Sequence, residues 1–260
     1  MIKPQQFSEL SVLITGGTSG IGLASAQGFA KAGVKAVGIV GRNVERAADA
    51  ARGLKADYPD LDVHSYVADV TSRNDVERLV AEVEGTSGAI DVLVNCAGGD
   101  PMPALFHTID IDAVTHATTY YMNATLLMCR AVIPGMYERK SGSIINVASD
   151  AAKVATTGET VIGAAMAAIT MFSKALAMEA KRSKVRVNAV TPSIVRSTRT
   201  YGRIQEGDFS ARLFAKAERL AMLGVVEPAE VAEVIVFLGG PLSSKVTGQA
   251  ISVNGGISAG

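Results

Sequence analysis

The stretch LSVLITGGTSGIG, residues 10–22, constrains the fold more strongly than any other part of the chain. A short apolar run, Val12–Ile14, ends in a cluster of small residues, and Ile21–Ala32 follows with the apolar spacing of a helix. This order predicts a strand, a glycine-rich turn and a helix in direct succession. A plain turn between a strand and a helix is the alternative, but the flanking elements and the position near the start of the chain favour a turn that binds a ligand.

Three glycines, Gly16, Gly20 and Gly22, stand where the backbone must turn tightly, approach a ligand closely and let the helix pack against the strand. A side chain at any of these positions would obstruct one of these tasks. The first turn of the helix presents free N–H groups and a positive dipole end, which an anion such as a pyrophosphate satisfies. The stretch therefore predicts a dinucleotide-binding turn.

Apolar, β-branched runs alternate with helix-like windows along the rest of the chain. The further expected strands are Val34–Val40, Leu61–Val67, Ile90–Asn95, Ser143–Ala148, Val185–Val190 and Ala250–Val253. The further expected helices are Asn43–Ala56, Ser72–Glu84, Asp110–Tyr137, Gly163–Lys181 and Pro228–Leu238. Because the strands are apolar on both faces, they predict a parallel sheet covered by helices on both sides. We expect one α/β domain over residues 1–260, a Rossmann-type doubly wound sheet of about seven strands.

Charge and composition exclude several classes of partner. The 25 Lys and Arg residues balance the 25 Asp and Glu residues, which gives no electrostatic reason to expect nucleic acid or anionic lipid. No segment has eighteen uninterrupted apolar residues, and Met1–Leu10 resembles no secretion signal, so we expect no membrane span and a cytoplasmic location. Cys96 and Cys129 predict buried free thiols in a reducing compartment. The histidines show no ligand spacing, so no metal is expected; they are His64, His107 and His116.

Several motifs, in this order and at these separations, identify the chain as similar to the short-chain dehydrogenase/reductase family over nearly its full length. The matching segments are Thr15–Gly22, Asp69–Val70, Asn95–Gly98, Val187–Pro192, Thr247–Gln249 and Val253–Gly256. One departure is Ser193, where the family usually has a glycine after the proline. The expected cofactor-binding residues are Gly16, Thr18, Ser19, Gly20, Ile21, Gly22, Arg42, Asp69, Val70, Asn95, Ala97, Gly98, Pro192 and Ile194.

The end of the second strand indicates which nicotinamide cofactor is bound. An acidic side chain there usually holds a free ribose 2′-hydroxyl, whereas a guanidinium suits a 2′-phosphate. Gly41 occupies the usual place of the acid, and Arg42 follows it. We therefore expect NADP(H) in preference to NAD(H). The alternative is that Arg42 only stacks on adenine or faces solvent.

The catalytic residues are where the chain departs from the family. The resemblance implies a serine after the fifth strand, and a tyrosine and a lysine four residues apart on the next helix. Ser149 fits the serine, but the register through Phe172–Lys174 places Ile162 and Met166 at the other two positions. Neither of these side chains can transfer a proton.

The resemblance also implies an asparagine in the preceding long helix. Counting back from Ala131–Pro134 places Tyr121 there, and a shift of two residues would offer Asn123 instead. Tyr121 is favoured because its spacing to Ser149 is the one the family has.

Three residues are therefore candidates for catalysis: Ser149, Tyr121 and Glu159. Tyr121 offers a phenol near the position of the missing asparagine. Glu159 becomes a general acid if burial raises its pKa. The competing interpretations are a packed ring for Tyr121 and a helix-start carboxylate, favoured by the helix dipole, for Glu159. Asp150 and Lys153 follow Ser149 closely and are further candidates to reach the site, unless Lys153 is only a solvated loop charge.

Two functions from different classes remain open. The first is an oxidoreductase with a rebuilt site that acts on a small-molecule carbonyl, alcohol or activated alkene. The second is a catalytically inactive subunit that assembles with an active relative. The helices Asp110–Tyr137 and Gly163–Lys181 are apolar beyond the needs of one buried face, and the resemblance implies that they form a dimer interface. We expect a homodimer or homotetramer, or a hetero-oligomer with an active subunit.

Residues 193–224 contain no clear strand, and a loop of this length predicts a lid over a substrate site. Its arginines and aromatic residues either bind an anionic substrate or face solvent. They are Arg196, Arg199, Tyr201, Arg203, Phe209 and Arg212.

Overall fold

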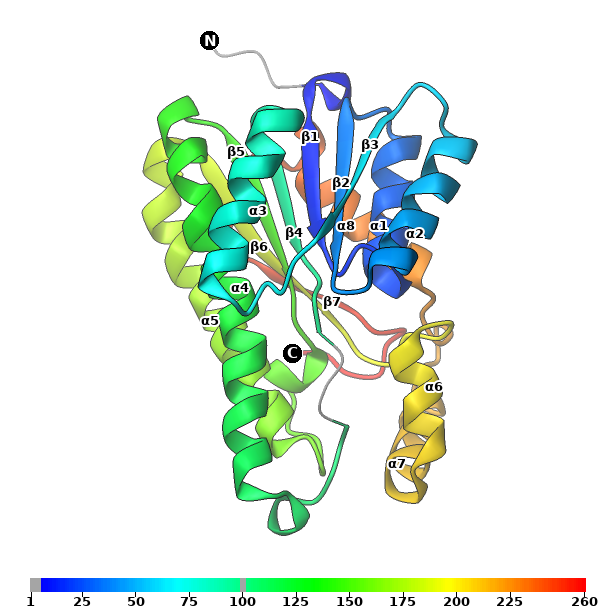
Figure 1. Cartoon of the computed structure of the whole chain (residues 1–260). Helices are drawn as coiled ribbons and strands as arrows, with labels where there is room; N and C mark the ends of the chain where they lie inside the picture. Colours follow the sequence, from blue (N-terminus) through cyan, green and yellow to red (C-terminus); the bar gives the residue numbers. More distant parts are fainter. Residues whose placement is uncertain (1–5, 99–101) are drawn as a thin grey trace.

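The computed structural model describes residues 6–98 and 102–260, and its centre is a parallel sheet of seven strands in the order β3-β2-β1-β4-β5-β6-β7 (Figure 1). The strands are β1 (Ser11–Thr15), β2 (Ala36–Gly41), β3 (Asp62–Val67), β4 (Val92–Asn95), β5 (Gly142–Val147), β6 (Val185–Pro192) and β7 (Ala250–Val253). The α-helices are α1 (Gly20–Lys31), α2 (Val44–Asp57), α3 (Arg73–Thr86), α4 (Ile111–Arg139), α5 (Thr160–Ala180), α6 (Arg199–Glu206), α7 (Asp208–Glu218) and α8 (Pro228–Gly239). Short 3-10 turns are η1 (Phe7–Glu9), η2 (Phe106–Thr108), η3 (Asp150–Ala152), η4 (Lys181–Ser183) and η5 (Pro241–Ser243).

Local sequence signals fix where several helices begin. Asn43 precedes α2, and its side-chain oxygen accepts a hydrogen bond from the Arg46 N–H at 2.8 Å. Thr198 precedes α6 and accepts from the Tyr201 N–H at 3.1 Å. Each bond satisfies an N–H group that the first helical turn leaves free. Proline at the first position of α8, Pro228, needs no such partner because it has no N–H.

Helices cover both faces of the sheet, so two apolar cores form. On one face α1, α2 and α8 bury Phe29 and Ile235 against the strands. On the other face α3, α4 and α5 bury Leu79 and Met128. The arrangement confirms the predicted doubly wound α/β sheet. The expectation that every strand is apolar on both faces was wrong for β3, which lies at an edge and has three exposed residues among its six.

Among the residues that the structure describes, one helix is long and apolar enough to cross a membrane. It is Thr160–Ser183, which comprises α5 and the turn after it. In the fold this helix lies against α4 and β6, and it buries Ile169 and Ala177. Its place in a helix layer therefore accounts for part of its apolar character, since 39% of its apolar window is buried. The expectation about Met1–Leu10 concerns in part residues 1–5, which lie outside the described part of the chain.

The strand order places a switch point at the middle of the sheet. From β1 the chain continues to β2 and β3 on one side, and it returns to β4 on the other side of β1. The connections that leave the carboxyl ends of β1 and β4 therefore diverge, which is where doubly wound sheets bind ligands. Beyond these ends, the start of α4 and the pair α6–α7 project on opposite sides (Figure 1). The expected lid, residues 193–224, thus contains two helices.

Candidate active site

A cleft of about 630 Å³ opens at the carboxyl ends of the strands. The turn after β1, the ends of β2, β4, β5 and β6, and parts of α4, α5 and α6 line it. Among the expected cofactor-binding residues, all but Gly22 and Asn95 line this cleft. Segments that are distant in sequence therefore meet at one site.

The glycine turn is shaped by close backbone contacts. Gly16 has φ +67°, and a Cβ atom there would lie 2.6 Å from the carbonyl oxygen of Cys96. A Cβ atom on Gly22 would lie 2.2 Å from the carbonyl oxygen of Gly16. The Thr15 hydroxyl accepts hydrogen bonds from the backbone N–H groups of Cys96 (3.1 Å) and Ala97 (3.3 Å). The turn is thus held against the end of β4, and only glycine fits at either position.

Two of the expected cofactor-binding residues, Gly22 and Asn95, lie behind the cleft wall and do not line the cleft. Gly22 lets α1 approach the turn, as its contact with Gly16 shows. The Asn95 side chain is 4% exposed and donates to Asn146 Oδ1 at 2.9 Å. Asn146 in turn donates to the Ser173 hydroxyl at 2.8 Å. Asn95 therefore joins β4, β5 and α5, and its side chain does not line the cleft.

Positive charge gathers at the end of β2. Arg42 and Arg46 both line the cleft, and the Arg42 guanidinium carbon lies 5.6 Å from the centre of the Tyr120 ring. A Cβ atom on Gly41 would lie 2.6 Å from Thr18 Cγ2, so an acidic side chain there would displace Thr18. The site thus presents guanidinium groups where an acid would hold a ribose hydroxyl.

Asp69 lines the cleft while it also shapes its own turn. Its Oδ1 accepts from the Thr71 N–H at 2.9 Å and from the Thr71 hydroxyl at 2.7 Å. Its N–H donates to Asp75 Oδ2 at 2.8 Å. These bonds fix the loop that carries Asp69 and Val70 to the cleft wall.

The three candidate catalytic residues, Ser149, Tyr121 and Glu159, all line the cleft. Ser149 Oγ accepts from the Ala151 N–H at 3.2 Å, so its own O–H remains available to donate. The Tyr121 ring is largely buried, and a Cβ atom on Gly98 would lie 3.2 Å from its Cε1. Serine and tyrosine side chains thus enter the cleft from η3 and α4, respectively.

Glu159 directly precedes α5, and its side chain makes no capping hydrogen bond. Burial raises the pKa of its carboxyl group above the ordinary value. A hydrogen bond with Thr156 opposes this shift, and the negative charge of Asp150 adds to it. Burial is thus the main cause of the raised pKa of this carboxyl group.

Ile162 and Met166 also line the cleft, one turn apart on α5. Both are buried, and they pack in a small apolar cluster that includes Tyr121 and Ile169. This part of the wall is therefore hydrocarbon, and it can neither donate nor accept a proton.

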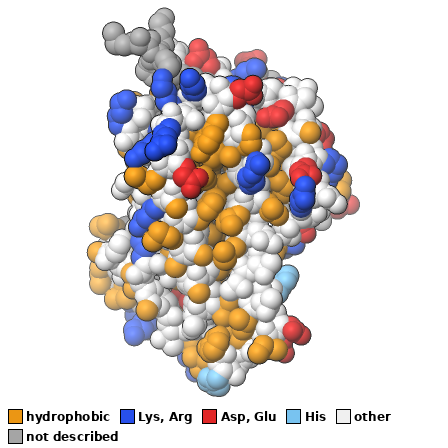
Figure 2. Space-filling model, turned by 90° about the vertical axis from the view of Figure 1, so that its left-hand side faces the viewer, with side chains coloured by type: hydrophobic (Ala, Val, Ile, Leu, Met, Phe, Trp, Pro, Cys, Tyr) orange, Lys and Arg blue, Asp and Glu red, His pale blue; other side chains and the backbone are white. Residues whose placement is uncertain are grey.

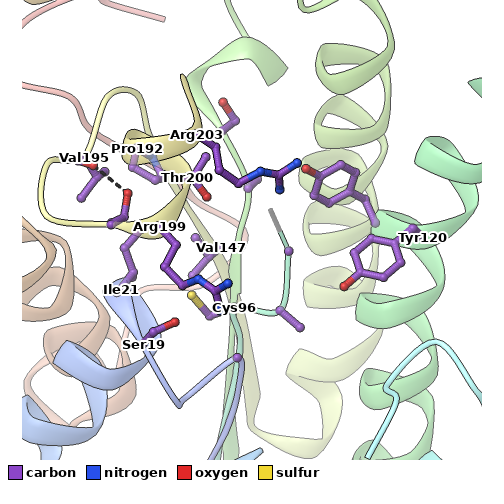
Figure 3. A pocket seen from close by; sticks show the side chains of 18 of the residues that line it. Ser19, Ile21, Cys96, Tyr120, Val147, Pro192, Val195, Arg199, Thr200 and Arg203 are labelled. Atoms are coloured by element: carbon purple, nitrogen blue, oxygen red, sulfur yellow. Dashed lines mark hydrogen bonds between the residues drawn. The ribbon is translucent and has the colours of Figure 1, made fainter. Parts of the chain in front are cut away.

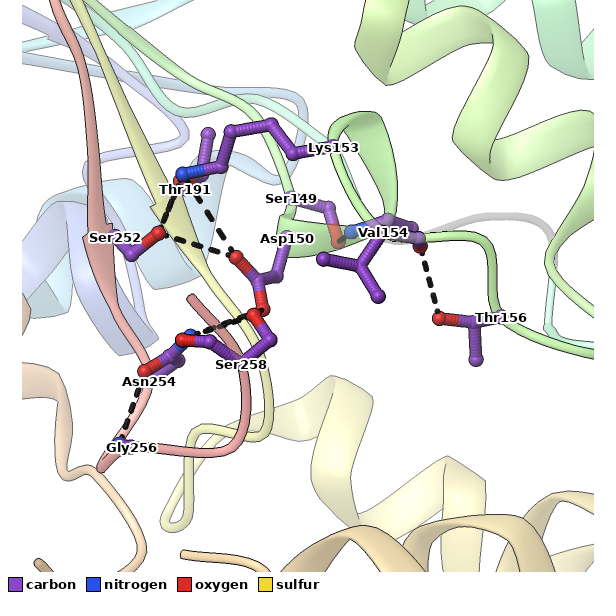
Figure 4. A network of polar contacts seen from close by, with 11 residues as sticks. Ser149, Asp150, Lys153, Val154, Thr156, Thr191, Ser252, Asn254, Gly256 and Ser258 are labelled. Atoms are coloured by element: carbon purple, nitrogen blue, oxygen red, sulfur yellow. Dashed lines mark hydrogen bonds and ion pairs between the residues drawn. The ribbon is translucent and has the colours of Figure 1, made fainter. Parts of the chain in front are cut away.

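Asp150 and Lys153 do not line the cleft, and Figure 4 shows both side chains directed toward Ser252. Lys153 Nζ lies 3.9 Å from Asp150 Oδ1 and donates to the Ser252 hydroxyl. The Asp150 carboxylate also accepts from Ser252 (3.2 Å), Asn254 (2.9 Å) and Ser258. The expectation that Asp150 and Lys153 reach the site was wrong, because both hold the C-terminal segment in place.

The lid arginines have different surroundings. Arg199 and Arg203 line the cleft, and Figure 3 shows both side chains extending into it. Arg196 lies 3.8 Å from Glu218, and the Arg212 side chain donates to the Asp208 carbonyl at 3.1 Å. Neither of these two arginines lines the cleft.

Aromatic residues of the lid have separate roles. Tyr201 lines the cleft and donates to Glu218 Oε1 at 2.8 Å. The ring of Phe209 covers Gly158, where a Cβ atom would lie 2.5 Å from its Cε1. The lid therefore contacts the loop that leads into α5.

Both cysteines are free, and burial raises the pKa of each thiol to about 12. Cys96 nevertheless contributes to the cleft wall, whereas Cys129 is buried beside Asn95. Within residues 6–98 and 102–260, no three His, Cys, Asp or Glu side chains form a group that could hold a metal ion.

The cleft contains residues that the motifs did not indicate. Arg46, Tyr120 and Thr125 line it in addition to the expected set. Arg46 lies four residues after Arg42, in the first turn of α2. A second arginine so close to Arg42 could have been recognised from the sequence as a further candidate for the cofactor site. Tyr120 and Thr125 carry no such signal, because their exposure to the cleft depends on how α4 is rotated.

Comparisons with known proteins agree with this geometry. Residues 16–258 match the family model described as enoyl-(acyl carrier protein) reductase. The chain is 33% identical over 244 residues to a 3-oxoacyl-[acyl-carrier-protein] reductase of Homo sapiens, covering 94% of this chain and 96% of that protein.

Two solved structures with NADPH bound are also similar. A short chain oxidoreductase of Pseudomonas aeruginosa PAO1, described as containing an atypical catalytic center, has a TM-score of 0.90 and 28% identity, covering 99% of this chain and 100% of that one. The L-sorbose reductase of Gluconobacter frateurii, in complex with NADPH and L-sorbose, has a TM-score of 0.88 and 31% identity, covering 98% of each chain.

Proposed function

Because the chain belongs to the short-chain dehydrogenase/reductase family, we propose that it is an NADP(H)-dependent oxidoreductase with a non-standard set of proton donors. Its substrate is a small carbonyl compound, the corresponding alcohol, or an activated alkene. The observation that carries this proposal is that Ser149, Tyr121 and Glu159 share one cleft with the glycine turn. In the same cleft Ile162 and Met166 present only hydrocarbon and sulfur.

The residues of the cleft fit a nicotinamide dinucleotide with a 2′-phosphate. The glycine turn leaves the space that a Cβ atom on Gly16 would fill, and the N-terminus of α1 suits a pyrophosphate. Arg42 and Arg46 would hold the 2′-phosphate, since a guanidinium makes charge-assisted forked hydrogen bonds. Thr18 packs against Gly41, so an acid at that position, which would favour NAD(H), would have to displace Thr18. Similarity to two NADPH-bound structures supports this choice.

The bound cofactor supplies or accepts a hydride at the substrate carbon. Ser149 orients the substrate by donating a hydrogen bond from its hydroxyl group to the substrate oxygen, and it keeps its proton. Glu159, whose raised pKa keeps more of the carboxyl group protonated, donates the proton that completes the reduction. Tyr121 donates a second hydrogen bond and fixes the orientation of the substrate. In the oxidative direction, Glu159 accepts the proton.

Cofactor binding and turnover can be tested on the purified protein alone. NADPH and NADH are titrated by fluorescence, and oxidation of NADPH is then followed with carbonyl and enoyl substrates. We expect tighter binding of NADPH than of NADH, and turnover that falls in Glu159→Gln, Tyr121→Phe and Ser149→Ala. Turnover unchanged in all three variants would contradict the assigned roles. Absence of binding to either cofactor would contradict the proposed function.

A catalytically inactive subunit is the second candidate, and two observations favour it. The apolar cluster around Ile162 and Met166 fills the positions where the resemblance implies a tyrosine and a lysine. On α5, Met171 and Met178 are 64% and 60% exposed. Figure 2 shows apolar side chains over the face that α4 and α5 form. A second subunit, identical or catalytically active, would cover this face.

Co-expression separates the two candidates. Under the second one, the chain alone is inactive with every substrate and elutes with an active relative in size-exclusion chromatography with light scattering. Turnover by the chain alone, lost in Glu159→Gln, would contradict this candidate.

A further inference from the structure

The start of the first lid helix lies beside the glycine turn. A Cβ atom on Gly20 would lie 3.4 Å from Thr198 Cγ2, so Thr198, the residue before α6, is a neighbour of the start of α1. Thr198 also accepts from the Tyr201 N–H at 3.1 Å, and its hydroxyl donates to the Val195 carbonyl at 2.9 Å. The start of α6 is therefore fixed against the part of the cleft that suits a pyrophosphate.

Arg199 is the first residue of α6, directly after Thr198, and its side chain extends into the cleft. Figure 3 shows its guanidinium group above Ser19 and beside Cys96, on the side of the glycine turn. Within the described part of the chain, Arg199 has no hydrogen bond and no ion pair, whereas Arg196 is paired with Glu218 at 3.8 Å. A cation directed into a cleft without a protein partner is available to bind an anionic ligand.

We infer that Arg199 binds the diphosphate of the cofactor, opposite the N–H groups of α1. The inference rests on the proposed dinucleotide site and adds a residue of the lid to it. The backbone N–H groups and the dipole of α1 act on the diphosphate from one side. The Arg199 guanidinium acts from the lid side, where its forked donors suit phosphate oxygens. Arg42 and Arg46 lie at a different place, the end of β2, and act on the 2′-phosphate.

Two ligands distinguish these phosphate sites in a binding experiment. NADPH carries both the diphosphate and the 2′-phosphate, whereas adenosine 2′-monophosphate carries only the latter. We expect Arg199→Gln to raise the dissociation constant for NADPH about tenfold and to leave that for adenosine 2′-monophosphate within twofold. Arg42→Gln should weaken binding of both ligands.

Arg196→Gln is the matched control, because Arg196 is an exposed arginine of the same segment outside the cleft. It should bind NADPH as the wild-type protein does. Arg199 is itself exposed, so Arg199→Gln should melt at the wild-type temperature. An unchanged NADPH affinity in Arg199→Gln, or an equal loss for both ligands, would overturn the inference while the proposed function stands. If the wild-type protein binds neither ligand, the proposed function fails and the inference fails with it.

Discussion

The guanidinium group of Arg42, at the end of β2, packs on the ring of Tyr120 from α4, with 5.6 Å between the guanidinium carbon and the ring centre. This contact joins the two walls of the cleft at the end that also contains Arg46. Arg42 is exposed and lines the cleft. A cation held over an aromatic face is stabilised by about 0.5–1 kcal/mol at an exposed site. Under the proposed function, this contact would help to position Arg42 for a 2′-phosphate.

Cofactor preference should depend on this arginine. We expect Arg42→Ala to raise the dissociation constant for NADPH at least tenfold, because a charge-assisted bond to the 2′-phosphate is lost, and to leave that for NADH nearly unchanged. Fluorescence titration with both cofactors measures the effect. Tyr120→Phe, which keeps the ring, is the control and should bind as the wild type does. Equal losses for NADPH and NADH would contradict the assignment.

The protonation of Glu159 should make both stability and turnover depend on pH. Because burial raises its pKa in the folded protein above the ordinary value of 4.5, the protonated form is favoured by folding. The protonated Glu159 carboxyl group therefore adds to the free energy of unfolding. This contribution is fully present below about pH 4.5 and is lost as the pH rises through the raised pKa. Urea unfolding from pH 4.5 to 8 should therefore show wild-type protein losing stability relative to Glu159→Gln.

The same variant tests the proton donor. Loss of a general acid slows turnover by about 10² to 10⁴, so Glu159→Gln should lower kcat in that range and remove the decline of kcat on the alkaline side. Glu233→Gln, an exposed glutamate of α8 outside the cleft, should leave kcat and its pH profile unchanged. If the pH profile of Glu159→Gln matched that of the wild type, another group would have to donate the proton to the substrate.

The two hydroxyl groups should contribute less than the acid. We expect about a tenfold to hundredfold lower kcat in Ser149→Ala and in Tyr121→Phe, because each loses one hydrogen bond to the reacting oxygen. Ser149→Thr keeps the hydroxyl and should retain most of the activity. NADPH affinity, measured by fluorescence, should be unchanged in Tyr121→Phe. A weaker NADPH affinity with unchanged kcat would instead give Tyr121 a role in binding the cofactor.

The fold could be predicted because its signals are local. Alternating apolar runs gave the strands to within about two residues, and Ala250–Val253 is a strand with the predicted bounds. The glycine spacing located the turn, since Gly16 and Gly22 contact each other within one motif. Each of these features depends on neighbours close in the sequence.

Side-chain direction at the site could not be predicted in the same way. Asn95 belongs to a cofactor motif, but its amide is directed to Asn146, 51 residues later in the chain. Lys153 lies four residues after Ser149, but it donates to Ser252, 99 residues later. A spacing rule contains no information on such distant partners. The burial that raises the pKa of Glu159 likewise depends on tertiary packing.

The Asp150 network should be a major source of stability for the C-terminal segment. Asp150→Ala leaves Lys153 and the donors of Ser252 and Asn254 without their common acceptor. Removing one partner of a buried pair costs about 3–5 kcal/mol, which urea unfolding measures. The control is Asp49→Asn, whose partner Arg52 is exposed and which should change stability by less than about 1 kcal/mol. Limited proteolysis should cleave the C-terminal segment faster in Asp150→Ala, and an unchanged rate would contradict its anchoring role.

Gly22→Ala tests whether close packing behind the glycine turn is needed for cofactor binding. The added Cβ atom would lie 2.2 Å from the carbonyl oxygen of Gly16, so α1 or the turn must move. We expect a loss of about 1–3 kcal/mol in the free energy of unfolding, and NADPH binding weaker by tenfold or more because the N–H groups of α1 shift. Gly53→Ala is the matched control, since an added Cβ atom in α2 meets nothing within 4 Å. Alanine forms helices better than glycine, so Gly53→Ala should gain up to about 1 kcal/mol and keep wild-type affinity for NADPH. Wild-type affinity in Gly22→Ala would show that the turn tolerates this movement, and the dinucleotide assignment would then lose its steric basis.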